Sequence, residues 1–234
     1  MGNEPEKQTR YRAVLFDGYG TLFSGAMEKL KEVCEAVVEG ECLDMDGAGF
    51  LESWERIFFP LVRGEPFATL AEAQTLSLKA LFGELGVTTM PEFYTRPMLE
   101  LLCSAEVYED VRPTLSRLGR LATGIVSNAD IVHIDSALSR NGLSFPVVVT
   151  SESAACYKPN PAIFETGLRE IGCTAAEALY VGDSQGDDIV GATGVGMDVA
   201  WLNRTGEKRK KGIPDPTYEI QSLAEVPMLV NPLL

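Results

Sequence analysis

The stretch RAVLFDGYGTLF, residues 12–23, opens as an apolar run and stops at a carboxylate, Asp17. A short apolar run that ends at a glycine-containing turn is typical of a strand buried in a parallel sheet. Similar runs predict further strands, so the expected strands are residues 11–16, 121–126, 146–150, 178–182 and 197–202. Apolar residues at helical spacing lie between them and predict helices at residues 112–120, 130–141, 161–171 and 187–193. Alternating strands and helices predict the α/β class, with a Rossmann-like doubly wound parallel sheet as the core.

Residues 25–105 break this alternation. Apolar residues recur there at helical spacing, as in the series Leu70, Ala73, Leu81 and Leu85, and no convincing strand is present. We therefore expect an inserted all-helical cap at residues 25–105, over the carboxyl edge of the sheet. The core would then consist of residues 1–24 and 106–234.

Composition narrows the functional classes. The chain has 34 acidic and 20 basic residues, a net charge of −14, which argues against nucleic-acid binding and favours a small-molecule substrate. The apolar stretches fall short of the ~18 to 20 residues of a membrane span, and the N-terminal residues MGNEPEKQTR lack the apolar segment of a secretory signal. We expect a cytoplasmic protein without membrane contact. Five scattered cysteines with no CxxC spacing predict reduced, mostly buried thiols.

Polar side chains follow several of the predicted strands. In an open parallel sheet the residues just past the carboxyl ends of the strands line a common crevice. The candidates in this crevice are Asp17, Thr21, Ser127, Asn128, Lys158, Asp183, Asp187 and Asp188. Lys158 is the lysine of the motif CYKPNP. Each of these residues is weak evidence alone, but their order and their positions at strand ends are specific.

With these motifs, the chain resembles the haloacid dehalogenase-like hydrolase superfamily, among its members with a helical cap of the first type. The resemblance extends from Tyr11 to about Leu223. It implies that Asp17 is the nucleophile, that Thr21 and Ser127 contact the anionic group of the substrate, and that Lys158 balances charge. It also implies a magnesium site made by Asp17, the backbone carbonyl of Tyr19, Asp183 and an acid of the pair Asp187 and Asp188, where the spacing of GDSQGDDIVGA favours Asp188.

Elementary chemistry is consistent with these roles. A carboxylate with an ordinary pKa near ~4 is ionised at neutral pH, so Asp17 needs no base to activate it. Asp183 and Asp188 beside Asp17 would repel one another, and a hard divalent cation with one lysine would relieve that repulsion. Mg²⁺ is the expected cofactor. Ser127, Asn128 and Thr21, with the amides of the loop after Asp17, could hold a phosphate or a carboxylate.

Tyr19 separates two kinds of chemistry. The superfamily's phosphatases normally have an aspartate two positions after the nucleophile, which protonates the leaving alkoxide. A positioned acid is worth on the order of 10² to 10⁴ in rate, whereas halide leaves without a proton. The superfamily's 2-haloacid dehalogenases carry D-x-Y-G-T here, so this motif alone indicates carbon–halogen cleavage. Those dehalogenases work without metal and have an uncharged residue in place of Asp183, so the motif GDSQGDD indicates a phosphatase.

The preferred prediction is a Mg²⁺-dependent phosphatase of a small phosphorylated metabolite, acting through a covalent aspartyl intermediate. Tyr19 is compatible with it because its backbone carbonyl, not its side chain, would be the metal ligand. The first alternative is a metal-independent 2-haloacid dehalogenase, with Arg56 or Arg63 of the cap as a candidate ligand for the substrate. The second is a non-catalytic binding or regulatory module that kept the fold and lost turnover through Tyr19.

Overall fold

The computed structural model describes residues 10–231 and contains a six-stranded, fully parallel sheet with the order β3-β2-β1-β4-β5-β6. Residues 1–9 and 232–234 of the predicted core lie outside the described part. The strands are β1 (Ala13–Phe16), β2 (Ala122–Ser127), β3 (Val147–Thr150), β4 (Ala178–Gly182), β5 (Asp198–Leu202) and β6 (Tyr218–Ile220). The predicted α/β class and doubly wound sheet are confirmed. The strand order turns back between β1 and β4, so these two central strands mark the switch point of the topology.

Strand β6 was not predicted. It has three residues, pairs only with β5 at the edge of the sheet, and exposes Glu219 between the less exposed Tyr218 and Ile220. Three alternating residues after a proline-containing loop are too short for a periodic signal. The edge strand therefore depends on pairing with β5 rather than on a pattern of its own.

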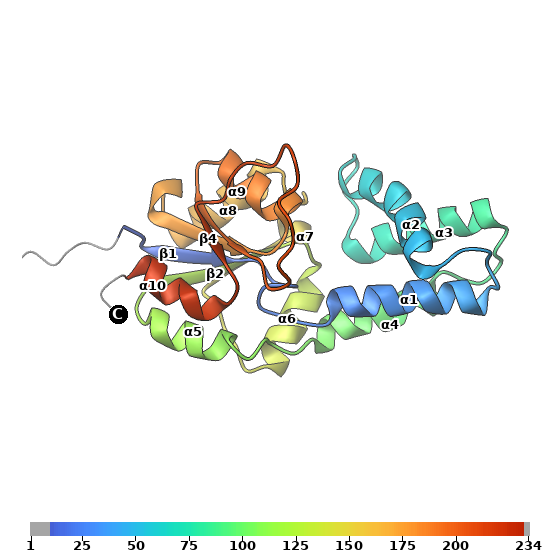
Figure 1. Cartoon of the computed structure of the whole chain (residues 1–234), viewed down its shortest axis with the longest axis horizontal. Helices are drawn as coiled ribbons and strands as arrows, with labels where there is room; N and C mark the ends of the chain where they lie inside the picture. The colour runs from blue at the N-terminus through green and yellow to red at the C-terminus, as the bar shows by residue number, and fades with distance from the viewer. Residues whose placement is uncertain (1–9, 232–234) are drawn as a thin grey trace, which may run out of the picture.

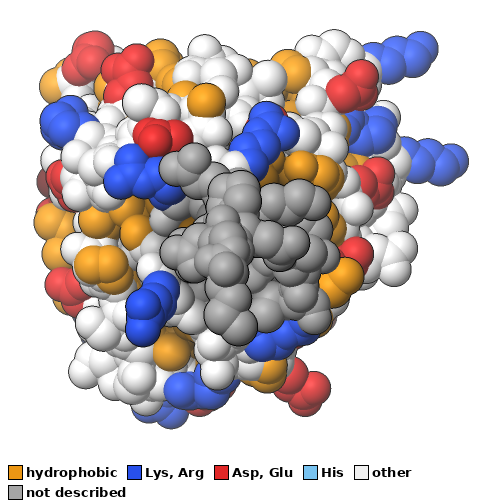
Figure 2. All heavy atoms as spheres, turned by 90° about the vertical axis from the view of Figure 1, so that its left-hand side faces the viewer, with side chains coloured by type: hydrophobic (Ala, Val, Ile, Leu, Met, Phe, Trp, Pro, Cys, Tyr) orange, Lys and Arg blue, Asp and Glu red, His pale blue; other side chains and the backbone are white. Residues whose placement is uncertain are grey.

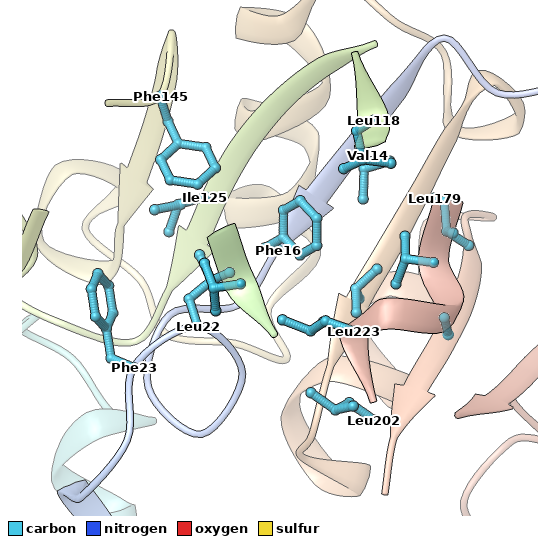
Figure 3. Packing of buried hydrophobic residues seen from close by; sticks show 14 of the residues in the cluster. Val14, Phe16, Leu22, Phe23, Leu118, Ile125, Phe145, Leu179, Leu202 and Leu223 are labelled. Atoms are coloured by element: carbon cyan, nitrogen blue, oxygen red, sulfur yellow. The ribbon is translucent and has the colours of Figure 1, made fainter. Parts of the chain in front are cut away.

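Two layers of helices cover the two faces of the sheet. Val14 and Phe16 of β1 point to one face and pack with residues of α5 (Val111–Leu118), α6 (Ile131–Arg140) and α10 (Val226–Val230). Figure 3 shows this packing around Phe16, Ile125 and Leu179. Ala13 and Leu15 point to the other face, against α8 (Pro161–Ile171) and α9 (Val190–Gly194). Burial of both faces explains why the strands are apolar runs instead of alternating ones.

Residues 26–104 form the inserted all-helical segment. Its helices are α1 (Ala26–Gly40), α2 (Gly47–Val62), α3 (Leu70–Leu85) and α4 (Glu92–Ser104). They have a hydrophobic core of their own, in which Phe50 and Trp54 of α2 pack with Leu78 and Phe82 of α3. Figure 1 shows α1 and α4 running away from the core and α2 and α3 lying beyond the end of the sheet where β1 terminates. The helical segment therefore faces the edge where the polar motifs lie.

The surface and the cysteines complete the description. Figure 2 shows the end of the core remote from α1–α4, where basic, acidic and apolar side chains lie interspersed. Within residues 10–231, no helix combines the length and the apolar character that crossing a bilayer requires. All five cysteines are free, as expected, but the prediction that most are buried was wrong. Only Cys34 is buried, because the other four lie in loops or near helix ends rather than in the centre of the helical core.

Candidate active site

Asp17 is the first residue after β1, at the switch point of the sheet. Its backbone N–H donates to the carbonyl of Val181 in β4 at 2.9 Å, which continues the ladder between the two strands by one residue. Its side chain is buried. Parallel strands of similar length end at the same edge, so the residues after β2 and β4 lie next to it.

A buried ion-pair network surrounds the Asp17 carboxylate. Lys158 Nζ donates to Asp17 Oδ1 and to Asp188 Oδ1, at 2.6 Å in both cases, although Lys158 is only 4% exposed. The Tyr180 hydroxyl lies 3.1 Å from Lys158 Nζ and donates to the Val126 carbonyl. Asp188 also accepts from the Ser184 N–H at 2.9 Å. Charge-assisted bonds to fixed partners hold Lys158 in one position beside the predicted nucleophile.

The protonation states follow from burial and charge. Burial raises the pKa of Asp17 to about 6, and the positive charge of Lys158 limits the rise. Burial disfavours the charged form of Lys158, but Asp17 and Asp188 outweigh it and hold the pKa of the lysine well above its ordinary value. At neutral pH Asp17 is therefore mainly a carboxylate beside an ammonium group, as a nucleophile requires.

Asp183 follows β4 and brings a third carboxylate to the site. Asp17, Asp183 and Asp188 each place one carboxylate oxygen at the site, and these three oxygens lie within 4.8 Å of one another. Burial and the negative charges of Asp17 and Asp188 raise the pKa of Asp183 to about 8. Three oxygen donors this close, with a single lysine between two of them, fit a hard cation such as Mg²⁺.

Asp183 is in close contact with the loop after β1 and with Trp201 of β5. The Thr21 hydroxyl donates to Asp183 Oδ1 at 3.2 Å, and the Trp201 indole N–H donates to the Asp183 carbonyl at 2.9 Å. A Cβ atom at Gly20 would lie 2.5 Å from Asp183 Oδ2, and Gly20 has φ of +94°. Glycine is therefore required at position 20 for both conformation and close approach.

Asp187 and Asp188 differ in their surroundings. They lie on η2 (Gln185–Ile189), a single π-helical turn in which the N–H of Ile189 bonds to the carbonyl of Ser184. Such turns are frequent at functional sites because they re-aim neighbouring side chains. Asp188 is completely buried beside Lys158, whereas Asp187 is half-buried and faces the cavity described below. Asp188, the acid favoured by spacing, is the one grouped with Asp17 and Asp183.

The remaining predicted residues lie around the same carboxylates. The Ser127 hydroxyl donates to Asp17 Oδ1 at 3.4 Å, and Asn128 holds the Lys158 backbone through its carboxamide, with the Lys158 N–H donating to Asn128 Oδ1 at 2.7 Å. The Tyr19 hydroxyl donates to the Leu102 carbonyl of α4 at 2.9 Å. Burial raises the pKa of Tyr19 above its ordinary value. Tyr19 thus connects the core to the helical segment.

A cavity of about 550 Å³ joins this edge of the core to helices α1–α4. Lys158, Asp183 and Asn128 line its core side. Of the two arginines named from the sequence, Arg63 lines the cavity. Arg56 instead pairs with Glu84 at 2.5 Å, and its side chain is 60% exposed. The pocket size is in the range of about 300 to 1,000 Å³ that encloses organic ligands of moderate size.

Comparison with known proteins places the chain in a family. Residues 67–202, more than half of the chain, match the family described as "Haloacid dehalogenase-like hydrolase". The chain belongs to this family. The resemblance inferred from the sequence motifs is therefore confirmed, and the hydrolase class with it.

Relatives of this haloacid dehalogenase-like hydrolase carry two kinds of activity in their names. The chain is 38% identical, over 52% of its length, to haloacid dehalogenase-like hydrolase domain-containing protein 3 of Danio rerio, and it spans about half of that relative. It is 24% identical over 95% of its length to (S)-2-haloacid dehalogenase of Pseudomonas fluorescens, covering 98% of it. It is 33% identical over 48% of its length to pyrimidine 5'-nucleotidase YjjG of Escherichia coli, covering 51% of it. The fold matches L-2-haloacid dehalogenase RSc1362 with a TM-score of 0.77 and 24% identity, over 95% of this chain and 99% of that one.

Two residues of this hydrolase's site were missed at the sequence level. The Tyr180 hydroxyl accepts from Lys158 Nζ and lies 3.0 Å from Asp188 Oδ1. A tyrosine inside an otherwise aliphatic strand was its signal, because a buried hydroxyl needs a partner. Arg204 lines the cavity and pairs with both oxygens of Asp110, at 2.8 and 3.0 Å. No local pattern marks Arg204, since its partner lies 94 positions earlier.

Proposed function

We propose that this hydrolase is a Mg²⁺-dependent phosphatase of a small phosphorylated metabolite, acting through an aspartyl-phosphate on Asp17. The grouping of Asp17, Asp183 and Asp188 carries the proposal. Lys158 bonds to Asp17 and Asp188, and Asp183 has a hydroxyl but no cation among its described partners. A site with this excess of negative charge would repel a phosphorylated substrate unless a cation bound to it.

The roles of the residues in the reaction follow from their positions. The Asp17 carboxylate attacks phosphorus, a bond from its oxygen to phosphorus forms, the bond from phosphorus to the alkoxide oxygen breaks, and the alkoxide takes up a proton from solvent water. Water then attacks the aspartyl-phosphate, releases inorganic phosphate and regenerates Asp17. Lys158 keeps Asp17 ionised and oriented, and the Ser127 hydroxyl donates to the same carboxylate oxygen, Oδ1. Asp17, Asp183, Asp188 and the Tyr19 carbonyl would hold Mg²⁺, which stabilises negative charge on the phosphoryl group.

The proposal assigns the helical segment a separate task. Residues 25–105 would be the cap that encloses the organic part of the substrate, while residues 1–24 and 106–234 carry out the chemistry. Thr21, Ser127 and Asn128 would position the phosphoryl group at the floor of the cavity. A cytoplasmic location, inferred from the sequence, belongs to the same proposal.

A 2-haloacid dehalogenase is the second candidate, and Tyr19 favours it. Its hydroxyl bonds to α4, so the residue in the usual position of the general acid offers no proton to a leaving alkoxide. In this case Asp17 would displace halide from carbon, and water would hydrolyse the resulting ester. Arg63 in the cavity wall would bind the substrate carboxylate. The relative from Pseudomonas fluorescens, which matches nearly the whole chain, supports this candidate.

A parallel assay distinguishes the two candidates. The wild type and Asp17→Asn are incubated with a panel of phosphate monoesters and with 2-chloropropionate, each with excess chelator or with excess Mg²⁺. We expect phosphate release that requires both Asp17 and Mg²⁺. Chloride release that persists in chelator, without phosphate release, would contradict the phosphatase and establish the dehalogenase.

A further inference from the structure

The cavity wall opposite the carboxylates contains a polar side chain with an unused hydrogen-bonding atom. Gln74 of α3 is 8% exposed and lines the same cavity as Lys158 and Asp183. Its Oε1 atom is buried and accepts no hydrogen bond. A buried carboxamide oxygen without a partner is uncommon in native proteins and costs stability.

The neighbours of Gln74 do not share this property. Trp54, Phe58 and Val62 of α2 line the cavity with apolar surface. The Trp54 indole N–H donates to the Ser77 hydroxyl at 2.7 Å, and that hydroxyl donates to the backbone carbonyl of Gln74 at 3.0 Å. Trp54, Ser77 and the Gln74 backbone carbonyl are thus paired with one another, whereas Oε1 of the same glutamine accepts no hydrogen bond.

Gln74 is also held in place relative to the core. The Asp130 carboxylate, at the entrance to α6, accepts from the backbone N–H groups of Leu70 and Ala71 at 2.6 and 3.0 Å. The Tyr157 hydroxyl donates to the carbonyl of Ala68 at 3.0 Å. Residues four apart on a helix lie on the same face, so Gln74 is one turn above Leu70 on the face turned to the cavity. These bonds tie the start of α3, one turn before Gln74, to the core.

We propose that Gln74 is a specificity-determining residue whose carboxamide oxygen accepts a hydrogen bond from a hydroxyl or N–H group in the organic part of the substrate. The substrate class is then a phosphate monoester that carries a hydrogen-bond donor away from its phosphate. This inference rests on the proposed phosphatase function. A 2-haloacid anion presents only acceptors and an apolar halogen, so it would leave Oε1 unpaired.

Paired substrates test the inference. We compare kcat/KM for n-alkyl phosphates of about three to five carbons with kcat/KM for the same esters bearing a terminal hydroxyl, in the presence of Mg²⁺. The wild type should prefer at least one hydroxylated ester by about 10-fold or more, because a site built to bind a donor discriminates against an analogue that lacks it. In Gln74→Met, which keeps the length of the side chain, this preference should disappear. Gln221→Met, at an exposed glutamine outside the cavity, is the matched control and should retain the wild-type preference.

Thermal unfolding separates specificity from a structural role. Because Gln74→Met removes an unpaired buried acceptor, its Tm without substrate should equal or exceed that of the wild type. An unchanged substrate preference in Gln74→Met would overturn the inference, and so would a lower Tm with equal losses on both esters. If the wild type releases phosphate but Gln74→Met gives either of these two results, the proposed function is retained and only the inference about Gln74 is wrong. Failure of the wild type to release phosphate from any ester would contradict the proposed function and remove the inference with it.

Discussion

The two walls of the cavity differ in how their polar groups are hydrogen-bonded. On the core side, Lys158 and Asp188 are buried and hydrogen-bonded to partners that come from different strands and turns. On the side of the helical segment, Trp54 and Phe58 supply apolar surface and Gln74 supplies an unpaired acceptor. A saturated polar network resists rearrangement, whereas an apolar wall adapts to the shape of a ligand. In the proposed reaction, this difference would give bond-making to the core and substrate selection to the helices.

Within the core wall, Asp188 and Asp183 show the same contrast on a smaller scale. Asp188 bonds to Lys158, to Tyr180 and to the Ser184 N–H. Asp183 has the Thr21 hydroxyl as its side-chain partner and lies on the cavity surface. Asp183 therefore has more free lone pairs for the proposed cation, whereas Asp188 would share its oxygens between the cation and the neighbours that it orients. We therefore expect substitutions at the two walls, and at the two acids, to affect different measurements.

The largest effect is expected at the nucleophile. Asp17→Asn keeps the shape of the side chain but removes the charge, and an amide does not displace an alkoxide or a halide. We expect turnover, measured as phosphate or halide release, to fall by at least about 10³-fold. Far-ultraviolet circular dichroism should show an intact fold. Retention of about a tenth or more of the activity would mean that the bond-making atom belongs to another residue.

Lys158→Met should have the second largest effect, on stability as well as on activity. The substitution leaves Asp17 and Asp188 buried without their counter-ion, and breaking a buried pair in this way costs about 3 to 5 kcal/mol. Urea unfolding at neutral pH measures the loss. Lys210→Met, at an exposed lysine, is the control and should change stability by less than about 0.5 kcal/mol. A loss below about 1 kcal/mol at Lys158 would show that the core wall is not the tightly coupled network described above.

Asp183→Asn should act on the metal rather than on the fold. Removing one of three carboxylates weakens cation binding, so we expect the Mg²⁺ concentration for half-maximal phosphate release to rise by about 10- to 100-fold. The pKa of Asp183 is raised to about 8 by burial and by its acidic neighbours, so the neutral amide should not destabilise the protein. Titration of activity with Mg²⁺ and thermal unfolding test both statements. Unchanged Mg²⁺ dependence would place the cation elsewhere or favour the metal-independent chemistry.

The core wall could be predicted from the sequence to a much greater extent than the helical wall. Asp17 and Asp183 follow β1 and β4, and Ser127 is the last residue of β2. A parallel sheet brings strand ends to one edge, so their proximity follows from order along the chain. Helical spacing identified α3 as a helix without showing which face meets the core. That face depends on contacts such as Asp130 with Leu70, 60 positions apart. Gln74 was missed for this reason, and Arg204 was missed because its partner Asp110 lies 94 positions away. Tyr180 was missed although a tyrosine in an aliphatic strand is a local signal.

Tyr19→Phe should give the smallest effect and tests the connection between the walls. The substitution removes only the hydroxyl that donates to the Leu102 carbonyl, a bond of 2.9 Å between the core and α4. We expect the free energy of unfolding to fall by about 0.5 to 1.5 kcal/mol, the usual net contribution of one hydrogen bond. The backbone carbonyl of residue 19, proposed as a metal ligand, is retained, so turnover and the Mg²⁺ requirement should stay within about 3-fold of the wild type. If turnover instead decreased by about 100-fold or more, the Tyr19 hydroxyl would have to take part in the reaction, since a single positioned proton donor contributes on the order of 10² to 10⁴ in rate.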